Sequence, residues 1–494
     1  MRACKIWILA VAVSSLSGCA FSPSSLVGPR PDSAQTAGPM APAVPSRWHA
    51  AVPAAIAPAA AELPPARPGA AVGVRHPLWW ARFGDPVLED LIAAAQAASP
   101  DLSSAGARVA QARSQRLMAR ADLWPSVQAR AGLGRGRAEP GQALATTASG
   151  SLQTAWEIDL FGARRAASQA AQARLDGAGA TQDAVRIAVA AEPALSYVQF
   201  RACQAQADLA LMDSRSREET ARLTALAATS GLRARADAAL AQAGAAQGRA
   251  LTVQQQAQCD RLLKALVALT AMDEPALRDR LAAAPGRLPP VAPPAVAVLP
   301  AALLQQRPDL SAAAAEVDAT GAELAQRQAQ RWPQMAVQGQ IGLARASGVD
   351  FTRDGSVWSI GPLSVTIPVF DGGRRDAAQR AAAAAYDDAS TRYRAALRQA
   401  VREVEEALVR VEAARSREAD TRQAAQSLAE VLRGTQERWT AGLASQFELE
   451  DARRSALAAR AALVDLEREQ VESAIALYRA LGGGWKDAAP SSPS

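Results

Sequence analysis

Two short stretches of this 494-residue chain place acidic residues at matched positions after a glycine–leucine step. Asp237 lies six positions after Gly231, and Glu448 lies six positions after Gly442. Asp451 follows three residues after Glu448, so these two carboxylates would share one face of a helix. Carboxylates held close together repel one another unless cations or protons intervene. The alternative is that all three are solvated residues at helix starts, where the helix dipole favours negative charge.

Few other residues are suited to chemistry. Both histidines, His49 and His76, lie in or just after a proline-rich segment, and the whole chain has only six methionines. The sequence contains no nucleophile–base pair, no metal-ligand spacing and no phosphate-binding loop. We therefore expect no catalytic residue, no metal and no cofactor. The formal net charge is only +6, and the basic residues are interspersed with acidic ones and form no patch. No nucleic-acid partner is therefore expected.

The amino terminus has the pattern of an export signal. Basic residues, an apolar run and the sequence "LSGC" precede Phe21, and this ending resembles a bacterial lipobox. We assign 1–18 to a signal peptide, Cys19 to lipidation and the proline-rich 19–76 to a tether. No aspartate follows Cys19, which favours the outer membrane. The alternative is a plain signal peptide with an incidental cysteine.

The remaining cysteines test how the chain folds back on itself. Cys203 lies 28 residues before Gly231, and Cys259 lies 28 residues after it. If Gly231 lies at the turn of an antiparallel helical hairpin, the two thiols meet, and an exported protein encounters oxidising conditions. We predict a Cys203–Cys259 disulfide. The alternative is a pair of small apolar residues in a helix seam.

The chain contains one pattern written twice. Four landmarks recur in the same order at offsets of 208 to 211 residues. The matching pairs are "PDLS" at 100 and 308, "WP" at 124 and 332, "FGARR" at 161 with "FDGGRR" at 370, and the glycine–leucine steps at 231 and 442. We assign 77–283 to a first repeat, 284–300 to a proline-rich linker and 301–485 to a second repeat. Residues 486–494 are expected to form a disordered tail.

Each repeat is expected to hold the same elements. An alanine-rich composition with only 4% aromatic residues is typical of long, closely packed helices. The pattern changes to a period of two at 126–160 and 334–369, which predicts one β-hairpin per repeat. Long helices then run to Thr229 and Thr440, and the chain turns at 230–234 and 441–445. Pro193 should kink or interrupt the first of these helices.

Four strands of membrane-crossing length cannot stand alone. Open strand edges cannot face lipid, and the smallest natural barrels use about eight strands. The chain must therefore be completed by other copies of itself, although this argument does not fix their number.

The landmarks together resemble the outer-membrane efflux family of TolC/OprM-like channels, and specifically its NodT-type lipoprotein branch. The resemblance rests on "WWARFGDPVLEDLI" from Trp79, on "QQRPDL" from Gln305, and on the paired hairpins and glycine–leucine turns. It implies a mostly α fold with a small membrane β-barrel part. Three copies would share a 12-stranded barrel and an α-helical periplasmic tunnel. It also implies a passive exit duct that docks on a periplasmic adaptor and an inner-membrane RND pump.

The same resemblance gives the glycine–leucine steps a role. Gly231, Leu232, Gly442 and Leu443 would form the periplasmic turns, where the tube narrows and meets the adaptor. Glu448, Asp451 and Asp237 would then surround the gate, and six carboxylates from Glu448 and Asp451 would favour cations. Some relatives brace the gate with an arginine where this chain has Ala444. Arg233, at the matching place in the first repeat, is a candidate substitute.

Other interpretations stay open at this point. The same channel could export protein or polysaccharide. A periplasmic adaptor would have one helical hairpin between β-rich domains, and an enzyme would need chemistry that the residues do not offer. Four tryptophans near the expected strand ends could form an interfacial girdle or simply pack: Trp124, Trp156, Trp332 and Trp358.

Overall fold

The computed structural model describes residues 77–137, 144–290, 306–348 and 351–483. The expected signal peptide, Cys19, the tether, most of the linker and the tail lie outside these residues. The described chain divides into a sheet unit, made of 123–165 and 325–379, and a helical unit. Among the described residues, no helix is both long enough and apolar enough to cross a membrane.

The sheet unit is one antiparallel sheet of four strands in the order β1-β2-β3-β4. The strands are β1 (Ser126–Gly136), β2 (Ala145–Ile158), β3 (Gln334–Gly348) and β4 (Thr352–Thr366). They lie within the two hairpins expected from the period-two pattern. The central pairing of β2 with β3 joins the two repeats into one sheet and leaves β1 and β4 as its edges.

Aromatic and acidic side chains hold one end of this sheet, where β1 and β3 begin and β2 finishes. The Trp156 Nε1 donates to the Leu123 carbonyl at 3.1 Å, and Phe161 stacks on Trp332 with ring centroids 5.5 Å apart. The Asp159 carboxylate accepts from the first amides of the following helix, which is a helix cap. Trp358 was expected near a strand end, but it pairs with Ile341 near the middle of β3 and β4.

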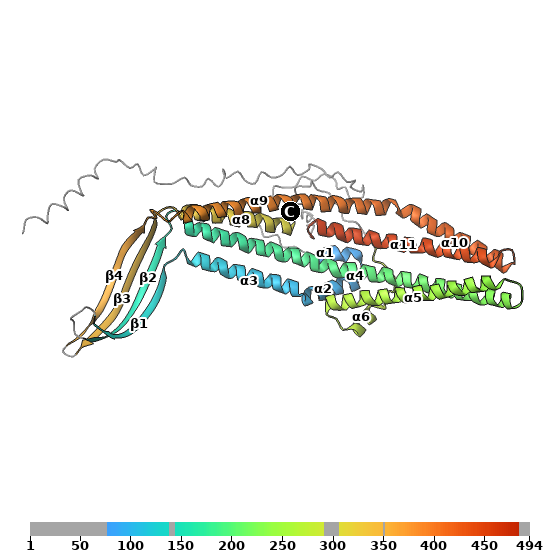
Figure 1. Ribbon diagram of the computed structural model, residues 1–494, viewed down its shortest axis with the longest axis horizontal. Helices are drawn as coiled ribbons and strands as arrows, with labels where there is room; N and C mark the ends of the chain where they lie inside the picture. Colours follow the sequence, from blue (N-terminus) through green and yellow to red (C-terminus); the bar gives the residue numbers. More distant parts are fainter. Residues whose placement is uncertain (1–76, 138–143, 291–305, 349–350, 484–494) are drawn as a thin grey trace, which may run out of the picture. The chain divides into compact units, whose positions relative to one another are not determined.

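The helical unit contains two long antiparallel hairpins and several shorter helices. Its first-half helices are α1 (Pro77–Trp80), η3 (Ala81–Phe83), α2 (Pro86–Ala98), α3 (Pro100–Ala121), α4 (Ala163–Thr229), α5 (Arg235–Thr270) and α6 (Glu274–Leu281). Its second-half helices are α8 (Pro308–Ala329), α9 (Arg374–Ser416), α10 (Glu418–Thr440) and α11 (Gln446–Ala480). Figure 1 shows α4 beside α5, and α10 beside α11.

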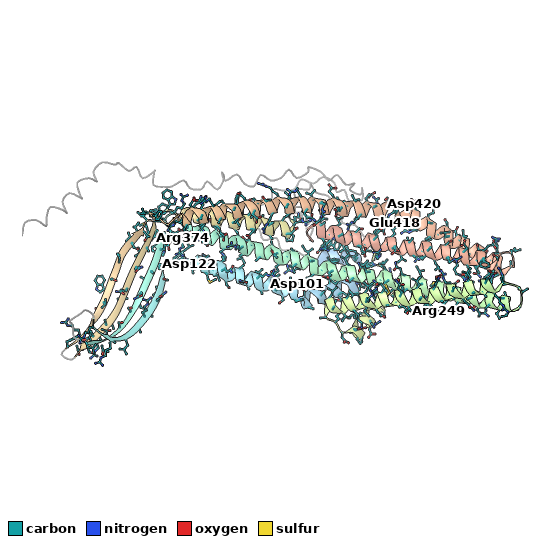
Figure 2. All side chains as sticks on the ribbon, viewed as in Figure 1. Asp101, Asp122, Arg249, Arg374, Glu418 and Asp420 are labelled. Carbon is teal, nitrogen blue, oxygen red and sulfur yellow. A yellow bond between two sulfur atoms is a disulfide. The ribbon has the colours of Figure 1, made fainter. Side chains whose placement is uncertain are left out.

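Of the expectation that Pro193 kinks or interrupts the first long helix, the interruption is wrong, and the expectation of an unbroken second long helix is wrong as well. Pro193 does not interrupt α4, which is a continuous helix of 67 residues. Its neighbours Ala190, Ala191 and Ala194 are fully buried, so packing holds this part of α4 in place although proline removes a backbone bond. The second long helix, in contrast, breaks at Arg417 into α9 and α10. Glu418, labelled in Figure 2, begins α10 and accepts from Gln470 of α11.

A compact core lies where the amino-terminal helices meet the long ones. Trp79 stacks on Tyr478 of α11 at 4.1 Å, and Leu88 and Leu91 of α2 are completely buried. Asp85 caps α2 and also accepts from the Tyr197 hydroxyl of α4 at 2.6 Å. These contacts fix α1 and α2 onto the long helices.

Buried arginines serve both repeats in the same way. Arg201 of α4 donates to the Leu281 carbonyl at the end of α6 at 2.7 Å. Arg307 donates to the Ala480 carbonyl at the end of α11, also at 2.7 Å, and pairs with Asp309 and Glu403. Each arginine thereby satisfies a helix carbonyl that has no partner within its own helix.

Candidate functional site

Both glycine–leucine steps form the same turn. Gly231 and Gly442 each have a φ of 74°, a backbone conformation that glycine adopts without strain. The Leu232 amide donates to the Ala227 carbonyl at 2.9 Å, and the Leu443 amide donates to the Arg438 carbonyl at 2.7 Å. This is the Schellman pattern that ends a helix. Both leucine side chains are left exposed, at 80% and 72%.

The helices that leave these turns begin differently. Ser445 accepts from the Glu448 amide at 3.2 Å, and the Glu448 carboxylate accepts from the Ser445 amide at 2.6 Å. This reciprocal capping box starts α11. The hydrogen bonds from Ser445 lower the pKa of Glu448, so its carboxylate stays ionised. In the first repeat, Ala234 offers α5 no side-chain cap.

Of the three expected gate carboxylates, Glu448 and Asp451 are exposed and Asp237 is half-buried, and each has an arginine nearby. Glu448 lies 3.8 Å from Arg438, Asp451 lies 3.6 Å from Arg454, and Asp237 lies 3.9 Å from Arg233. The structure brings Glu448 and Asp451 together on the first turns of α11. Asp237 lies on the first hairpin, in α5. Arrangement of these carboxylates around an opening would require further copies of the chain.

Arg233 links the two turns. Its guanidinium lies over the ring of Phe447 in α11, 4.8 Å from the ring centroid. The sequence suggested Arg233 as a brace because Ala444 cannot serve as one. The observed contact is a cation–π interaction with an aromatic ring, typically worth about 0.5–1 kcal/mol at an exposed site.

Sequence reasoning missed a buried polar cluster close to these turns. Glu450 of α11 is only 7% exposed, and its carboxylate accepts from the Ser216 hydroxyl of α4 at 2.8 and 3.0 Å. Arg453 donates to both Ser216 and Glu450, and Gln446 contacts Thr220 of α4. The cluster joins the first hairpin to the second. In the string "ELED" nothing distinguishes Glu450 from its exposed neighbours.

A disulfide fixes the first hairpin. The sulfur atoms of Cys203 in α4 and Cys259 in α5 are 2.08 Å apart, with their Cα atoms 5.6 Å apart. Gln255 donates to the Cys203 sulfur and to Gln206, which adds a polar contact between the same helices. The pairing holds α4 against α5 well away from the turn at Gly231.

The sheet presents two exposed faces of opposite character. Cross-strand partners share a face, so the register groups the side chains into two sets. One face is apolar and includes Val127, Ala129, Leu133, Leu152, Val337, Ile341, Leu343, Trp358, Ile360 and Val365. The other face is polar and includes Gln128, Arg130, Ser149, Ser151, Gln153, Gln340, Ser359 and Ser364. Large apolar side chains that are half or more exposed mark the first face as one that needs a covering.

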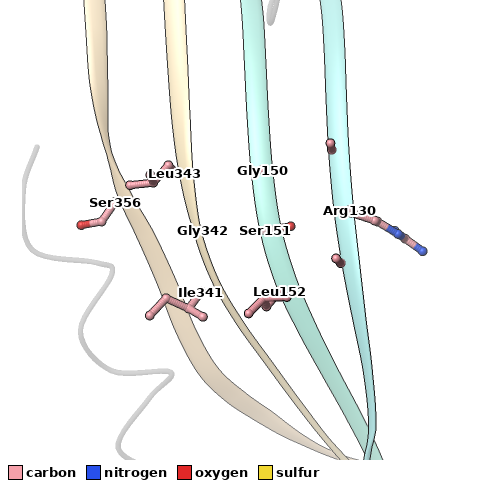
Figure 3. A pocket seen from close by; sticks show the side chains of 10 residues that line it. Arg130, Gly150, Ser151, Leu152, Ile341, Gly342, Leu343 and Ser356 are labelled. Atoms are coloured by element: carbon pink, nitrogen blue, oxygen red, sulfur yellow. The ribbon is translucent and has the colours of Figure 1, made fainter.

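A shallow hollow lies on the apolar face. It has a volume of about 600 Å³ and is lined by Ala129, Ala131, Leu152, Ile341 and Leu343, among others. Figure 3 shows the leucine and isoleucine side chains on one side of the strands, with Arg130 extending to the other side. Its nearly hydrocarbon lining suits acyl chains better than a polar solute.

A chain with this sheet and these paired turns is similar to proteins of one known family. The family model described as "Outer membrane efflux protein" matches residues 91–272 and 299–483. The chain belongs to this family, whose members are channels of the bacterial outer membrane with a long periplasmic portion. It is an outer-membrane channel component of an efflux system.

Individual relatives agree. The pyoverdine export outer membrane protein OpmQ of Pseudomonas putida is 29% identical over 435 residues, spanning 84% of this chain and 89% of that protein. The outer membrane protein OprJ of Pseudomonas aeruginosa is 30% identical over 390 residues, spanning 76% and 80%. The structure of the outer-membrane channel OprN has a TM-score of 0.74 at 28% identity and covers 90% of this chain and 98% of that one. VceC of Vibrio cholerae gives 0.72 at 26% identity, covering 82% and 98%.

Proposed function

We propose that three copies of this chain form one channel, with twelve strands, four from each copy, closing a barrel in the outer membrane. The observation that carries this proposal is the polarity of the sheet. One face is apolar and exposed, the other is polar and exposed, and both edge strands lack partners among the described residues. Lipid requires an apolar surface and no open edge, and water in a lumen requires a polar lining. Closure with other copies satisfies all three demands.

The helical hairpins form the periplasmic part of this channel in our proposal. Leu232 and Leu443 project from the two turns, and such exposed leucines suit contact with a periplasmic adaptor. The adaptor would connect the channel to an inner-membrane RND pump, which supplies the energy and selects the substrates. The channel itself would be a passive exit duct, with no cofactor and no catalytic step. Lipidation of Cys19 would anchor the amino terminus in the outer membrane.

Glu448 and Asp451 form the gate in this proposal. They are exposed, close to a turn and on one helix, so three copies would bring six carboxylates to the narrow end. The capping box holds the Glu448 carboxylate against the helix start, while the side chain of Asp451 is 81% exposed. Asp451 is therefore the better placed of the two to reach an opening. Asp237 contributes less, because it lies on the other hairpin beside Arg233.

A deletion strain tests the efflux function. The gene is deleted, and the deletion strain receives either a plasmid with the wild-type gene or an empty vector. Growth is then measured in the presence of antibiotics, dyes, detergents and siderophores. We expect the empty-vector strain to become more susceptible to at least one compound, with wild-type tolerance restored by the intact gene. Unchanged susceptibility to every compound would contradict the proposal.

A further inference from the structure

The polar face of the sheet carries one charge in its central part. Arg130 lies in the middle of β1, and its side chain is exposed. The row across the sheet at this level is Arg130, Ser151, Gly342 and Val357. Figure 3 shows the Arg130 side chain extending away from the strands, on the side opposite to Leu152.

The neighbours of Arg130 on this face are uncharged. Gln128 and Gly132 flank it along β1, and Ser149 and Gln153 lie diagonally on β2. No carboxylate on the face within the described strands is close enough to neutralise it. The positive charge of its guanidinium therefore has no neighbouring counter-charge on this face of the described strands.

The remaining charges on this face do not reverse its sign. Within the described strands they are Arg353, at the loop end of β4, and Glu157, at the opposite end of β2. Glu157 is already paired with Arg164. The polar face therefore has an excess of positive charge, whereas the expected gate carries carboxylates.

We propose that Arg130 is a selectivity residue of the channel and gives its strand-built part a preference for anionic solutes. This inference rests on the proposed closed trimer, because only there does the polar face line a lumen. Three copies then place three Arg130 guanidinium groups around one water-filled passage, with three Arg353 groups nearer the loop end. Like charges lining a water-filled passage raise the local concentration of ions of the opposite sign. The solutes that gain are those with carboxylate, sulfonate or phosphate groups.

Ion selectivity of the whole mature protein tests the inference. The protein is extracted from outer membranes and inserted into planar bilayers that separate two KCl concentrations, and the reversal potential gives the ratio of chloride to potassium permeability. Four variants are compared with wild type: Arg130→Gln, Arg130→Glu, Arg130→Lys and Arg135→Gln. Arg135 lies on the same strand but on the other face, so it is the matched control.

We expect the chloride-to-potassium ratio to fall in Arg130→Gln and to fall further in Arg130→Glu, while conductance is retained. Arg130→Lys keeps the charge and should keep the wild-type ratio, as should Arg135→Gln. Wild-type ratios in both Arg130→Gln and Arg130→Glu would overturn the role of Arg130 and leave the channel proposal standing. If neither the wild type nor the variants conduct ions, the channel proposal is overturned, and this inference with it.

Discussion

At the residue scale, the contacts that hold the gate region in place lie beside the expected gate residues. Glu448 and Asp451 are exposed, whereas Glu450 between them is buried against Ser216 of the other hairpin. Removal of a buried hydrogen-bonded carboxylate leaves its partners unsatisfied, which costs more than the hydrogen bonds themselves contribute. Glu450 is thus the residue of this triplet whose loss should weaken the contact between α4 and α11.

The first prediction follows from that contrast. Replacing Glu450 by alanine should destabilise the contact between α4 and α11 by about 1–3 kcal/mol, because Ser216 and Arg453 lose a buried acceptor. Asp451→Ala is the matched control and should change stability by less than about 0.5 kcal/mol. Amide hydrogen exchange of the two helices measures both effects. Equal protection in the two variants would show that the buried cluster contributes nothing.

The second prediction concerns acid stability. Burial alone would raise the pKa of Asp309, but the hydrogen bonds and positive charge of Arg307 outweigh burial and lower that pKa. Because the folded pKa is depressed, this carboxylate stabilises the protein above the unfolded value of about 3.9, and the contribution is lost as pH falls through the folded pKa.

Asp309→Asn should therefore lower the unfolding temperature at neutral pH, and the difference from wild type should shrink as pH falls below about 4. Asp101→Asn is the control, since Asp101 holds the matching position at the start of α3 (Figure 2) and has no buried arginine two residues before it. Thermal unfolding followed by circular dichroism at several pH values gives both curves. A difference that stays constant with pH would argue against the pairing with Arg307.

At the element scale, the two hairpins have the same turn but differ in how they are held together. The first has a disulfide between α4 and α5. The second relies on apolar and polar contacts between α10 and α11, and α10 has no fully buried residue. The break at Arg417 gives the second hairpin a further point of weakness. We therefore expect the second hairpin to exchange its amides faster than the first.

A third prediction uses the disulfide. Changing both Cys203 and Cys259 to serine should remove about 2–4 kcal/mol of stability, because the bond closes a long loop in the unfolded chain. Faster hydrogen exchange should appear in α4 and α5 and leave α10 and α11 unchanged. Equal loosening of both hairpins would mean that the bond does not act on the first hairpin alone.

The fourth prediction compares a turn glycine with a glycine inside a helix. The two substitutions should change stability in opposite directions. Gly442→Ala forces an alanine into the left-handed region and should cost about 1–2 kcal/mol. Gly434→Ala, inside α10, meets no atom within 4 Å and should instead stabilise the helix by about 0.5–1 kcal/mol. Unfolding temperatures of the two variants should therefore move in opposite directions. A shift in the same direction would contradict the assigned backbone geometry.

Most helices, strands and turns could be predicted from the sequence, because residues within each element determine where it begins and ends. Prolines mark where α3 and α8 begin and end, glycine marks both turns, and alternation marks the strands. The exceptions depend on contacts between distant segments. Pro193 stays helical because its surroundings are packed, and Glu450 is buried because Ser216, 234 residues away in sequence, lies beside it. Such partners leave no local pattern.

At the scale of the whole molecule, we propose that the sheet functions only with further copies of the chain. Its apolar face is covered by nothing among the described residues, and its edge strands leave backbone groups without partners. The open strand edges are costly in lipid and disappear when copies close into a ring. The apolar face is costly in water and would then face lipid. The proposed gate carboxylates and Arg130 would also acquire their roles only when several copies surround one axis.

The mass of the assembled protein tests this account most directly. The mature protein is extracted from outer membranes in mild detergent, and native mass spectrometry gives the mass of the particle after the detergent is removed. We expect a particle of three chains that dissociates only on denaturation. A folded, stable particle of one chain would contradict it.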